Sequence, residues 1–486
     1  MRQLLAAALP VLLGACTVGP DYREPEFPTP PAYQDIPTAA EAPFSRPVSG
    51  QADLSQWWGQ FQDAELQRLI GQALAANLDL MSAASRIRQA REQEIVQGAA
   101  GLPNVNATAA AVRLHSNSNP LAKLGAGGNG NGGAADNAPS GGTDLKLYSA
   151  GFDASWEIDV FGGVRRGVEA ARANSEAALW ALRDGEVSLT AEVANDYLTL
   201  RATQRRIAIV ESELQRQRDT LGLISARAAT GFVTELDVNQ QSAQVAATAA
   251  QLPPLEAQSR ALVHALSILL GQQPEAMAAE LQAAGAIPPV PASLPIGLPS
   301  DLLRRRPDVR EAERRLAAAT AQVGVAVAQL YPKFNLLALA SFAGSSLGNL
   351  FSADNLSEAG AGLVSWPIFT GGKSQANVEI SREQLNQAYL AYQQSVLKAL
   401  QDSEDSLARF SAEQQRLASL QSSIAAANSS FTIAQQQYVA GLTDYLSVLT
   451  AQTTLLNLQD QVAQSQAALA ADLVALYKAL GGGWNA

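Results

Sequence analysis

The sequence predicts a mainly α-helical protein with a small β part, in which one pattern of elements occurs twice. Two proline-free stretches, Val164 to Thr230 and Lys373 to Ala440, each suit a single helix of about 100 Å. Four short segments alternate between apolar and polar residues, as half-exposed strands do. Landmarks also recur at a fixed distance, since Trp156 and Trp366 stand 210 positions apart. Together these observations favour two long helical hairpins accompanied by four strands.

Residues 1–15 have the layout of a secretory signal peptide. Arg2 gives a basic start, Leu4 to Leu13 are almost wholly apolar, and small residues precede Cys16. The apolar run is shorter than the roughly 20 residues of a membrane-spanning helix. Cys16 is the only cysteine in 486 residues, and Leu13 to Cys16 resembles the lipobox of bacterial lipoproteins. We therefore expect N-acyl and S-diacylglycerol groups on Cys16; the alternative is an unlipidated signal peptide with an incidental cysteine.

Composition and charge exclude several classes of function. The formal net charge is −11, from 34 basic and 45 acidic residues, and there is no basic patch of the kind that nucleic acid requires. No long apolar run follows the signal peptide, so no transmembrane helix is expected. Residues 16–56 are rich in proline and lack periodicity, which predicts an extended N-terminal strap.

The remainder of the chain divides into two structural repeats, residues 57–290 and 299–480, followed by a tail of residues 481–486. Matching landmarks differ by 229 positions early in the repeats and by 210 later: Pro103 and Pro332, then Trp156 and Trp366, Gly231 and Gly441. The first repeat therefore holds nineteen extra residues, and a glycine- and asparagine-rich run between Pro103 and Trp156 accounts for them as a loop. We interpret the chain as an internal duplication.

The four predicted strands span residues of about 103–114, 149–161, 333–342 and 360–369. The second has the cleanest alternation, with apolar residues at even positions from Phe152 onward and polar ones at odd positions. A strand of this pattern has one apolar and one acidic face. The acidic face carries Asp153, Glu157 and Asp159, which we expect to line a water-filled lumen.

About ten residues are enough to cross a bilayer as a tilted strand, and this is the interpretation that we favour. Four strands cannot close a transmembrane barrel, and an open sheet edge in lipid leaves backbone groups without hydrogen bonds. The smallest barrels need about eight strands. Three chains would supply twelve, so the pattern predicts a barrel that a trimer shares. The alternative is a half-buried strand of a soluble sandwich, which the long helices between the strands disfavour.

Gly231 and Gly441 end the two long helices, since glycine just past a helix end is the expected stop. A second helix then returns, so each repeat forms a long antiparallel hairpin with its tip at the glycine. Pro253-Pro254 must kink or break the return helix of the first repeat. Apolar residues at intervals of seven predict left-handed supercoiling of packed helices: Val448, Leu455, Val462, Leu469 and Leu476, with Val238, Val245 and Leu252 in the first repeat.

The stretch Leu298 to Leu316 predicts a helix start, with Ser300 or Asp301 as the cap and Pro307 in the first turn. The arginine run Arg304 to Arg306 has two interpretations, an anion site or a set of structural ion pairs. Ion pairs are favoured because acidic residues follow closely, at Asp308, Glu311 and Glu313.

Several of these stretches together resemble a known family. They are the lipobox followed by Val18 to Tyr22 (VGPDY), the pair Trp57-Trp58 with Phe61, "LLRRRPDV" at Leu302 to Val309, and the tip at Gly441. They are similar to outer-membrane efflux factors, most of all to the NodT/OprM-type lipoproteins, which are relatives of TolC. The resemblance covers nearly the whole mature chain.

The resemblance implies a homotrimer in the cell outer membrane. Its strands would form one twelve-stranded β-barrel, and its helices a hollow periplasmic α-barrel. A periplasmic adaptor, or membrane fusion protein, would dock on the hairpin tips at Gly231 and Gly441. An inner-membrane pump of the RND type would supply the energy. The chain itself would then be a passive duct for small molecules such as drugs.

The resemblance also implies a periplasmic gate of acidic residues near the tips, where like charges repel. Asp237 stands six residues after Gly231 and matches the family's acid in the first repeat. In the second repeat the family has acids six and nine residues after the glycine, where this chain has Ser447 and Thr450. The gate or tip residues that we expect are therefore Asp237, Asp444 and Tyr438.

Three other functions are weaker alternatives. A duct for protein secretion would use the same architecture, whereas a lipid-anchored coiled-coil lipoprotein that spaces the envelope would leave the strands unexplained. An enzyme is disfavoured because the two histidines stand alone, with His264 expected in a helix core and His115 beside a strand. No Cys or His cluster fits a metal site, and GAGGNGNGG lacks the Lys-Ser/Thr of a phosphate loop. We expect no catalysis and no cofactor other than the lipid.

Overall fold

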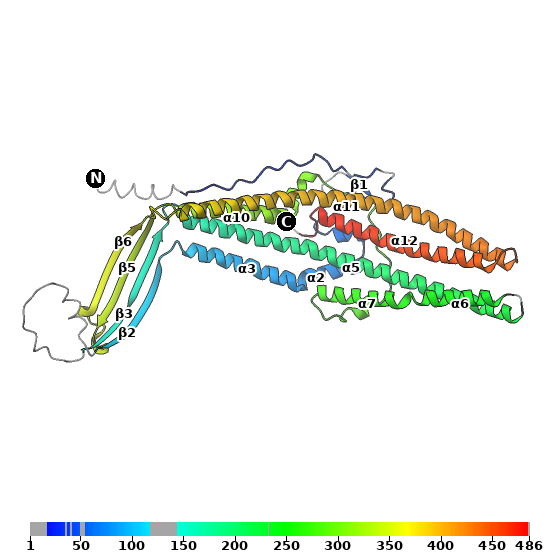
Figure 1. Cartoon of the computed structure of the whole chain (residues 1–486), viewed down its shortest axis with the longest axis horizontal. Helices are drawn as coiled ribbons and strands as arrows, with labels where there is room; N and C mark the ends of the chain where they lie inside the picture. The colour runs from blue at the N-terminus through cyan, green and yellow to red at the C-terminus, as the bar shows by residue number, and fades with distance from the viewer. Residues whose placement is uncertain are drawn as a thin grey trace, which may run out of the picture. The chain divides into compact units, whose positions relative to one another are not determined.

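A computed structural model describes residues 17–34, 36–38, 41–48, 54–116, 143–231 and 233–484. The predicted signal peptide and Cys16 lie outside these residues. The chain divides into two compact units, whose elements are labelled in Figure 1. The strand unit comprises the N-terminal segment up to Arg23, Ala90–Asn174 and Ala317–Gln387, and the helix unit comprises Glu24–Gln89, Ser175–Leu316 and Ala388–Ala486.

The strand unit contains a four-stranded antiparallel sheet in the order β2-β3-β5-β6. The strands are β2 (Asn104–Ser116), β3 (Thr143–Ile158), β5 (Lys333–Gly344) and β6 (Leu356–Ser365). The central pair, β3 and β5, joins the two predicted repeats. All four predicted strands are present, and the first strand of each repeat starts within one residue of its predicted position.

The second strand of each hairpin differs most from the prediction: β3 starts at Thr143, six residues before the predicted start, and both β3 and β6 end earlier than predicted because the backbone turns earlier. β3 ends at Ile158, where the Val160 N–H donates to the Ile158 carbonyl at 2.9 Å. β6 lies four residues earlier than 360–369, and the Ile368 N–H donates to the Trp366 carbonyl at 2.9 Å just after it. Asp159 therefore lies beyond the end of β3, and its prediction as a strand acid is wrong.

The hairpins β2–β3 and β5–β6 have the same register once the two sequence offsets are applied. Asn104 pairs with Ser155 in the first hairpin, and Lys333 pairs with Ser365 in the second. Lys333 is 229 positions after Asn104, and Ser365 is 210 positions after Ser155. The offsets that relate the two halves of the sequence thus also relate their strand pairing.

A tryptophan side chain closes each hairpin in the same way. The Trp156 indole N–H donates to the Gly101 carbonyl at 2.9 Å. The Trp366 indole N–H donates to the Leu330 carbonyl at 3.0 Å. Gly101 and Leu330 again stand 229 positions apart, so corresponding residues make corresponding contacts.

The two long helices are α5 (Gly163–Ala229) and α11 (Lys373–Val439), each of 67 residues. At 1.5 Å per residue each is about 100 Å long, as predicted. The helices that return from their ends are α6 (Glu235–Ala249) and α7 (Leu252–Leu269) in the first repeat and α12 (Tyr445–Ala479) in the second. The predicted break in the first return helix is present, since α7 starts with Pro253 and Pro254 in its first turn.

Shorter elements complete the chain. β1 (Arg46–Val48) pairs in parallel with β4 (Ser293–Pro295). Four 3-10 turns are η1 (Trp57–Phe61), η2 (Pro299–Asp301), η3 (Leu347–Asn349) and η4 (Ala353–Asn355). The remaining helices are α2 (Ala64–Ala76), α3 (Leu78–Ala99), α8 (Ala278–Leu281), α9 (Leu302–Arg305) and α10 (Pro307–Ala328).

The helix start predicted at Leu298 consists of two short elements, η2 and α9, which precede α10. The Asp301 carboxylate accepts the Leu298 N–H at 3.0 Å within η2, and makes no cap bond to α9. The chain breaks at Arg306, and Pro307 begins α10 as predicted. Asp301 is the residue before α9, but the predicted side-chain cap on this helix is absent because its carboxylate bonds to Leu298.

The ion-pair interpretation is confirmed for the last arginine of the run. Arg306 is buried, and its guanidinium donates to Asp308 at 2.7 and 3.0 Å and to Asp402 at 3.1 Å. Because Asp402 belongs to α11, this arginine connects the start of α10 to a long helix. Further ion pairs follow along α10 at Arg310–Glu313 and Arg315–Glu311.

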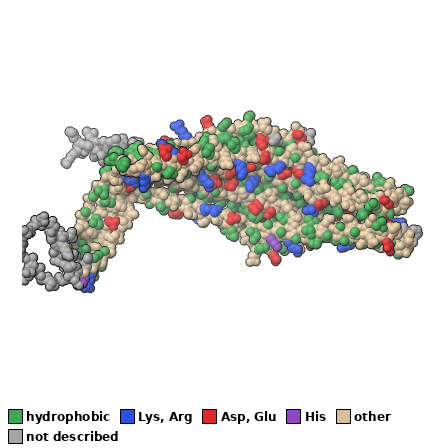
Figure 2. Space-filling model, in the orientation of Figure 1, with side chains coloured by type: hydrophobic (Ala, Val, Ile, Leu, Met, Phe, Trp, Pro, Cys, Tyr) green, Lys and Arg blue, Asp and Glu red, His purple; other side chains and the backbone are tan. Residues whose placement is uncertain are grey.

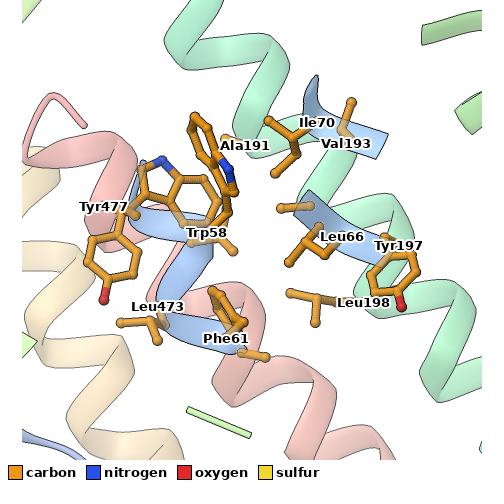
Figure 3. Packing of buried hydrophobic residues seen from close by; sticks show 14 of the residues in the cluster. Trp58, Phe61, Leu66, Ile70, Ala191, Val193, Tyr197, Leu198, Leu473 and Tyr477 are labelled. Atoms are coloured by element: carbon orange, nitrogen blue, oxygen red, sulfur yellow. The ribbon is translucent and has the colours of Figure 1, made fainter. Parts of the chain in front are cut away.

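The core of the helix unit is mostly aliphatic and contains a group of packed aromatic side chains (Figure 3). Trp57 stacks on Tyr477 with ring centroids 5.2 Å apart, and meets Trp58 and Phe61 edge-on. The Tyr477 hydroxyl donates to Gln60 Oε1 at 2.6 Å, which satisfies its buried polar atom. The Trp57-Trp58 pair of the sequence is therefore a packing feature, and each such buried side chain contributes roughly 2–3 kcal/mol.

The described part of the N-terminal strap is extended, as predicted, and it includes the short strand β1. Gln414 of α11 holds it in place. Its Oε1 accepts the Phe44 and Ser45 N–H groups at 3.0 and 2.8 Å, and its Nε2 donates to the Ser45 carbonyl at 3.2 Å. Ser45 and Gln414 are both fully buried, so these bonds replace lost contacts with water.

The seven-residue pattern is correct for the second repeat and incomplete for the first. In α12 the predicted residues are buried or half-buried, from Val448 to Leu476. In α6 and α7, the fully buried set with the same spacing starts with Gln241 and Thr248, while Val238 and its successors are only half-buried. A polar row therefore occupies part of the packing surface that the apolar residues were predicted to fill.

Candidate functional site

The sheet has one face with polar groups near the ends of its strands. Asp153 of β3 is half-buried and accepts a hydrogen bond from Asn106 Nδ2 of β2 at 3.0 Å. Four residues further along β3 and on the same face, Glu157 makes an ion pair with Lys333 of β5 at 3.2 Å. Both predicted acids thus share one face with polar partners, as a water-lined surface requires.

The opposite face of the same strands is apolar and exposed. Phe152 and Trp156 of β3 are 61% and 36% exposed, and Val364 of β6 is 65% exposed. Exposed apolar side chains grouped at this end of the sheet mark a surface that another apolar phase or partner covers, whereas Lys146 and Glu358 occupy the same face further along the strands. Figure 2 shows hydrophobic side chains over the strands, whereas acidic and basic side chains are interspersed along the long helices.

Asp159 has a structural role at the start of α5. Its carboxylate accepts the Arg165 N–H at 2.9 Å and makes an ion pair with the Arg165 side chain at 3.4 Å. A carboxylate at the first turn of a helix is stabilised by the free N–H groups and by the helix dipole. Of the three predicted lumen acids, the sheet therefore holds Asp153 and Glu157.

The N-terminal segment after Cys16 binds within the strand unit. Arg166, only 3% exposed, donates to the Val18 carbonyl at 3.2 Å and to the Asp21 carboxylate at 2.6 Å. A Cβ on Gly19 would lie 2.4 Å from the Cα of Gly324, so only glycine fits this approach. The VGPDY stretch is therefore the part of the strap that docks on α5 and α10.

The hairpin tips turn at the two predicted glycines. Gly231 and Gly441 have φ of +79° and +72°, in the left-handed region that glycine adopts without strain. At the second tip, the Leu442 N–H donates to the Gln437 carbonyl at 2.8 Å, and the Gly441 N–H donates to the Tyr438 carbonyl at 3.0 Å. These bonds close the last turn of α11 in the manner of a glycine C-terminal cap.

The two candidate gate acids both cap the helices that return from the tips. Asp237 forms a capping box with Thr234, accepting its N–H at 3.1 Å. Asp444 caps α12 by accepting the Ser447 hydroxyl at 2.6 Å and the Ser447 N–H at 3.0 Å, and these bonds lower the pKa of Asp444. Both acids therefore carry a structural role whether or not they also face a pore.

Tyr438 packs inside the helix unit and is half-buried. Its ring meets Tyr445 of α12 edge-on at 5.4 Å, and the Arg227 guanidinium of α5 lies 5.8 Å from its centroid. Burial raises the pKa of Tyr438, and its hydroxyl has no hydrogen-bond partner among the described residues. The structure thus brings Tyr438 into contact with residues of both hairpins, and the nearby Asp237 charge contributes to its raised pKa.

Sequence reasoning missed a buried polar network that joins the two hairpins. The Tyr445 hydroxyl donates to Gln241 Oε1 at 2.6 Å, and Gln241 Nε2 donates to the Gln217 carbonyl at 2.7 Å. Glu213, 3% exposed, accepts from Gln217 at 2.9 Å and from Gln452 at 2.6 Å. The spacing of seven between Tyr445 and Gln452 is the sequence feature that could have indicated it.

Other classes of site find little support in the described part of the chain. No group of His, Cys, Asp and Glu there is arranged to hold a metal ion. Within the same residues, no helix is both long and apolar enough to cross a membrane. His115 and His264 are both exposed, so the prediction of His264 as a core residue is wrong.

Comparison with known proteins identifies relatives over the whole chain. At 33% identity, it is similar to the pyoverdine export outer membrane protein OpmQ of Pseudomonas aeruginosa, covering 100% of this chain and 98% of the relative. At 30% identity, it is similar to nodulation protein T of Rhizobium leguminosarum bv. viciae, covering 83% and 78%. A solved structure of the outer-membrane channel OprN matches with a TM-score of 0.84 and 34% identity, covering 96% and 100%.

A solved structure of CusC matches with a TM-score of 0.80 and 26% identity, covering 96% of this chain and 100% of the other. OprN is described as an outer-membrane channel, and the CusC structures are described in connection with transmembrane channel formation. The model of the family described as outer membrane efflux protein matches residues 69–272 and 298–482, one stretch in each predicted repeat. The chain therefore belongs to the outer membrane efflux protein family.

Proposed function

We propose that this chain is the outer-membrane duct of a tripartite efflux system, which passively conducts small molecules such as drugs to the exterior. The observation that carries the proposal is a sheet with exposed apolar residues around Trp156 on one face and with Asp153 and Glu157 on the other, in the same chain as two helices of 67 residues. Lipid would cover the apolar face, and water would fill the lumen beside Asp153 and Glu157.

Three copies would complete the channel. Backbone groups at an open sheet edge are costly in lipid, so the four strands of one copy need further strands beside them. Twelve strands from a homotrimer close a barrel, and the long helices of three copies would form a hollow periplasmic cylinder. The two halves of the chain would then be repeats of one unit around the ring.

The hairpin tips would dock an adaptor, which connects the duct to an inner-membrane pump of the RND type. Apolar side chains next to Gly231 and Gly441 support this, since Leu236, Val439 and Leu442 are 64%, 70% and 78% exposed. Solvent-exposed apolar groups at a turn fit a surface that a partner protein covers. Three residues stand close in sequence to these exposed side chains: Asp237, Asp444 and Tyr438. They would act as gate residues at the periplasmic entrance.

Lipid on Cys16 would anchor the chain beside the barrel. The Val18 N–H donates to the Phe161 carbonyl at 3.1 Å, so the second residue after Cys16 is fixed just past the end of β3. Acyl chains on Cys16 would therefore enter the membrane at the level of the strand ends. Relatives are named for pyoverdine export, cation efflux and toluene efflux, which supports a duct whose selectivity resides in the pump.

The proposal is tested on the full chain extracted from outer membranes in mild detergent. Light scattering with detergent subtracted should give the mass of three chains, and the particles should conduct ions in planar bilayers. Deletion of the gene should raise the accumulation of pump substrates in the cell. A monomer without conductance would instead favour the lipid-anchored spacer, and loss of a secreted protein without a change in drug accumulation would favour the secretion duct.

A further inference from the structure

The helix unit contains a pocket of about 610 Å³ that none of the sites described above uses. Residues of α5, α11 and α12 line it, together with the extended segment 284–290 that follows α8. Much of its lining is apolar, with Phe44, Ile287, Val290, Leu417 and Leu469 among the residues. Pockets of roughly 300–1,000 Å³ with a mainly apolar lining and a few polar groups are typical of small-molecule sites.

The lining of this pocket carries positive charge. Among the described residues that line it, Arg205 is the only charged one, in a chain whose formal net charge is −11. Arg205 is exposed and makes no ion pair with a described residue. A neighbouring pocket shares Arg205, Ala208 and Gln466 with the first, adds Arg216, and again has no Asp or Glu among its described lining residues. This charge distribution favours an anion over a cation.

A buried guanidinium without an ion pair to a described residue lies behind this lining. Arg201 is 7% exposed, and its Nη1 donates to Gln204 Oε1 at 2.9 Å and to the Ala283 carbonyl at 2.7 Å, which are both uncharged. Its Cζ lies 4.8 Å from the centroid of the Tyr197 ring. Its Nε has no hydrogen-bond partner among the described residues. A charge buried in this way is costly unless an opposite charge comes close to it.

Gly285 brings the pocket close to this guanidinium. A Cβ on Gly285 would lie 2.9 Å from both Cζ and Nε of Arg201, so the glycine that lines the pocket is in direct contact with the buried cation. Glu65 does not neutralise it, because Glu65 pairs with Arg68 at 2.7 Å. That bond lowers the pKa of Glu65, and Arg201 makes a smaller contribution. A negative charge in the pocket would therefore compensate Arg201.

We propose that this pocket binds an amphipathic organic anion, a molecule with one carboxylate and an apolar body of drug size. The carboxylate would bond to Arg205, and the buried charge of Arg201 would stabilise it. The apolar body would pack against Leu417 and Leu469. The proposal does not depend on the proposed duct, because all of these residues belong to the helix unit of one copy.

Two sources share this chemistry, a rigid aromatic acid and a fatty acid from membrane lipid. Gln421 and Gln466 also line the pocket, and their side-chain amides bond to no described residue. They offer donors and acceptors for further polar groups, which a rigid aromatic acid carries more often than a simple acyl chain does. Probes of both kinds are therefore compared.

Equilibrium dialysis of the full-length protein in mild detergent tests the site. The probes are radiolabelled naphthoate and decanoate, and uptake by protein-free micelles in a parallel cell is subtracted. Saturable binding of one molecule per chain is expected. Arg205→Gln should weaken it by about tenfold or more, because a hydrogen bond between two charged groups is lost. Ala208→Phe should abolish binding, because the ring would occupy space that Ala208 lines.

Matched controls separate the outcomes. Arg218→Gln removes another exposed arginine of α5, outside the pocket, and should bind as the unmodified chain does. Naphthalenemethanol has the apolar body without the charge, and acetate has the charge without the body, so neither should compete at concentrations that saturate the site with the probe. Thermal unfolding checks that each variant is folded, and Arg205→Gln, at an exposed position, keeps the test decisive if Ala208→Phe is not.

The results have distinct meanings. Tighter binding of naphthoate would support the proposal with a rigid aromatic acid as ligand, and tighter binding of decanoate would support it with a fatty acid. Uptake no greater than that of micelles alone would overturn it. Binding that Arg205→Gln leaves unchanged, or that Arg218→Gln weakens equally, would also overturn it, and none of these results would affect the duct.

Discussion

At the scale of single residues, position in the fold decides what each conspicuous side chain does. Gly441 has φ of +72°, and a Cβ there would meet no atom within 4 Å, so its backbone conformation alone requires glycine. Gly222 also has open space but lies inside α5. Glycine is therefore favourable at position 441 and unfavourable at position 222. The residue type alone does not reveal this difference.

Replacing these two glycines by alanine should have opposite effects on stability. Gly441→Ala introduces strain in the left-handed region and should destabilise the hairpin by about 1 kcal/mol. Gly222→Ala removes a flexible residue from a helix and should stabilise it by about 0.5–1 kcal/mol. Thermal unfolding followed by circular dichroism measures both. Equal shifts in the same direction would contradict the assignment of the tip.

Asp196 in α5 should make stability depend on pH. Burial, together with the nearby Glu192 charge, raises the pKa of Asp196 to about 6. Because this pKa is above that of the unfolded chain, the stability associated with the protonated carboxyl is present below about pH 4 and is lost as pH rises through about 6. Asp196→Asn should therefore raise the unfolding temperature at pH 8 and change it little at pH 4. A shift of equal size at both pH values would contradict the raised pKa.

At the scale of elements, the hairpins combine an apolar packing surface with a polar one. Val448 and Leu455 are buried on α12, whereas Gln241 and Thr248 are buried at equivalent spacing along the first return helix. The buried Gln241 amide is stable there because both of its ends have partners, the Tyr445 hydroxyl at Oε1 and the Gln217 carbonyl at Nε2. The polar network thus fixes how the two hairpins align, since a slip of one turn would leave these groups without partners.

Tyr445 and Tyr438 offer a matched test of this network. Tyr445→Phe deletes the hydroxyl that donates to Gln241 and leaves a buried acceptor without its bond, at a cost of about 1–3 kcal/mol. Tyr438→Phe deletes a hydroxyl that has no such partner among the described residues, and should change stability little. Urea unfolding of the helices distinguishes the two variants. Equal losses would mean that the network does not hold the hairpins together.

At the scale of the whole molecule, much of the fold follows from the sequence, and the departures have local causes. The helices of 67 residues and their glycine ends follow from missing prolines and from two residues, Gly231 and Gly441. The end of β3 was misplaced because one backbone hydrogen bond, from Val160 to Ile158, ends a strand that the alternation would continue. Contacts between residues far apart in the sequence could not be predicted, because they produce no periodic pattern. The hydrogen bond from Arg166 to the Val18 carbonyl is an example.

The proposed lipid anchor belongs to this scale, because it concerns attachment of the entire proposed assembly. Cys16→Ser should abolish metabolic labelling with palmitate, while the proposed trimers should still form, since the strands would also hold the chain in the membrane. Ser45→Cys lies outside the lipobox and serves as a control that should keep its label. Normal labelling of Cys16→Ser would contradict the lipobox.

The bonds between Gln414 and Ser45 also bear on the order in which the chain is built. The two residues are 369 positions apart, so the strap is synthesised and exported long before its partner on α11 exists. Contacts of such long sequence separation form late, since the intervening chain must be brought together first. The strap is therefore free of this contact during export, when the enzymes that would remove the predicted signal peptide and acylate Cys16 would act. The strap docks on α11 only after the rest of the protein has been synthesised.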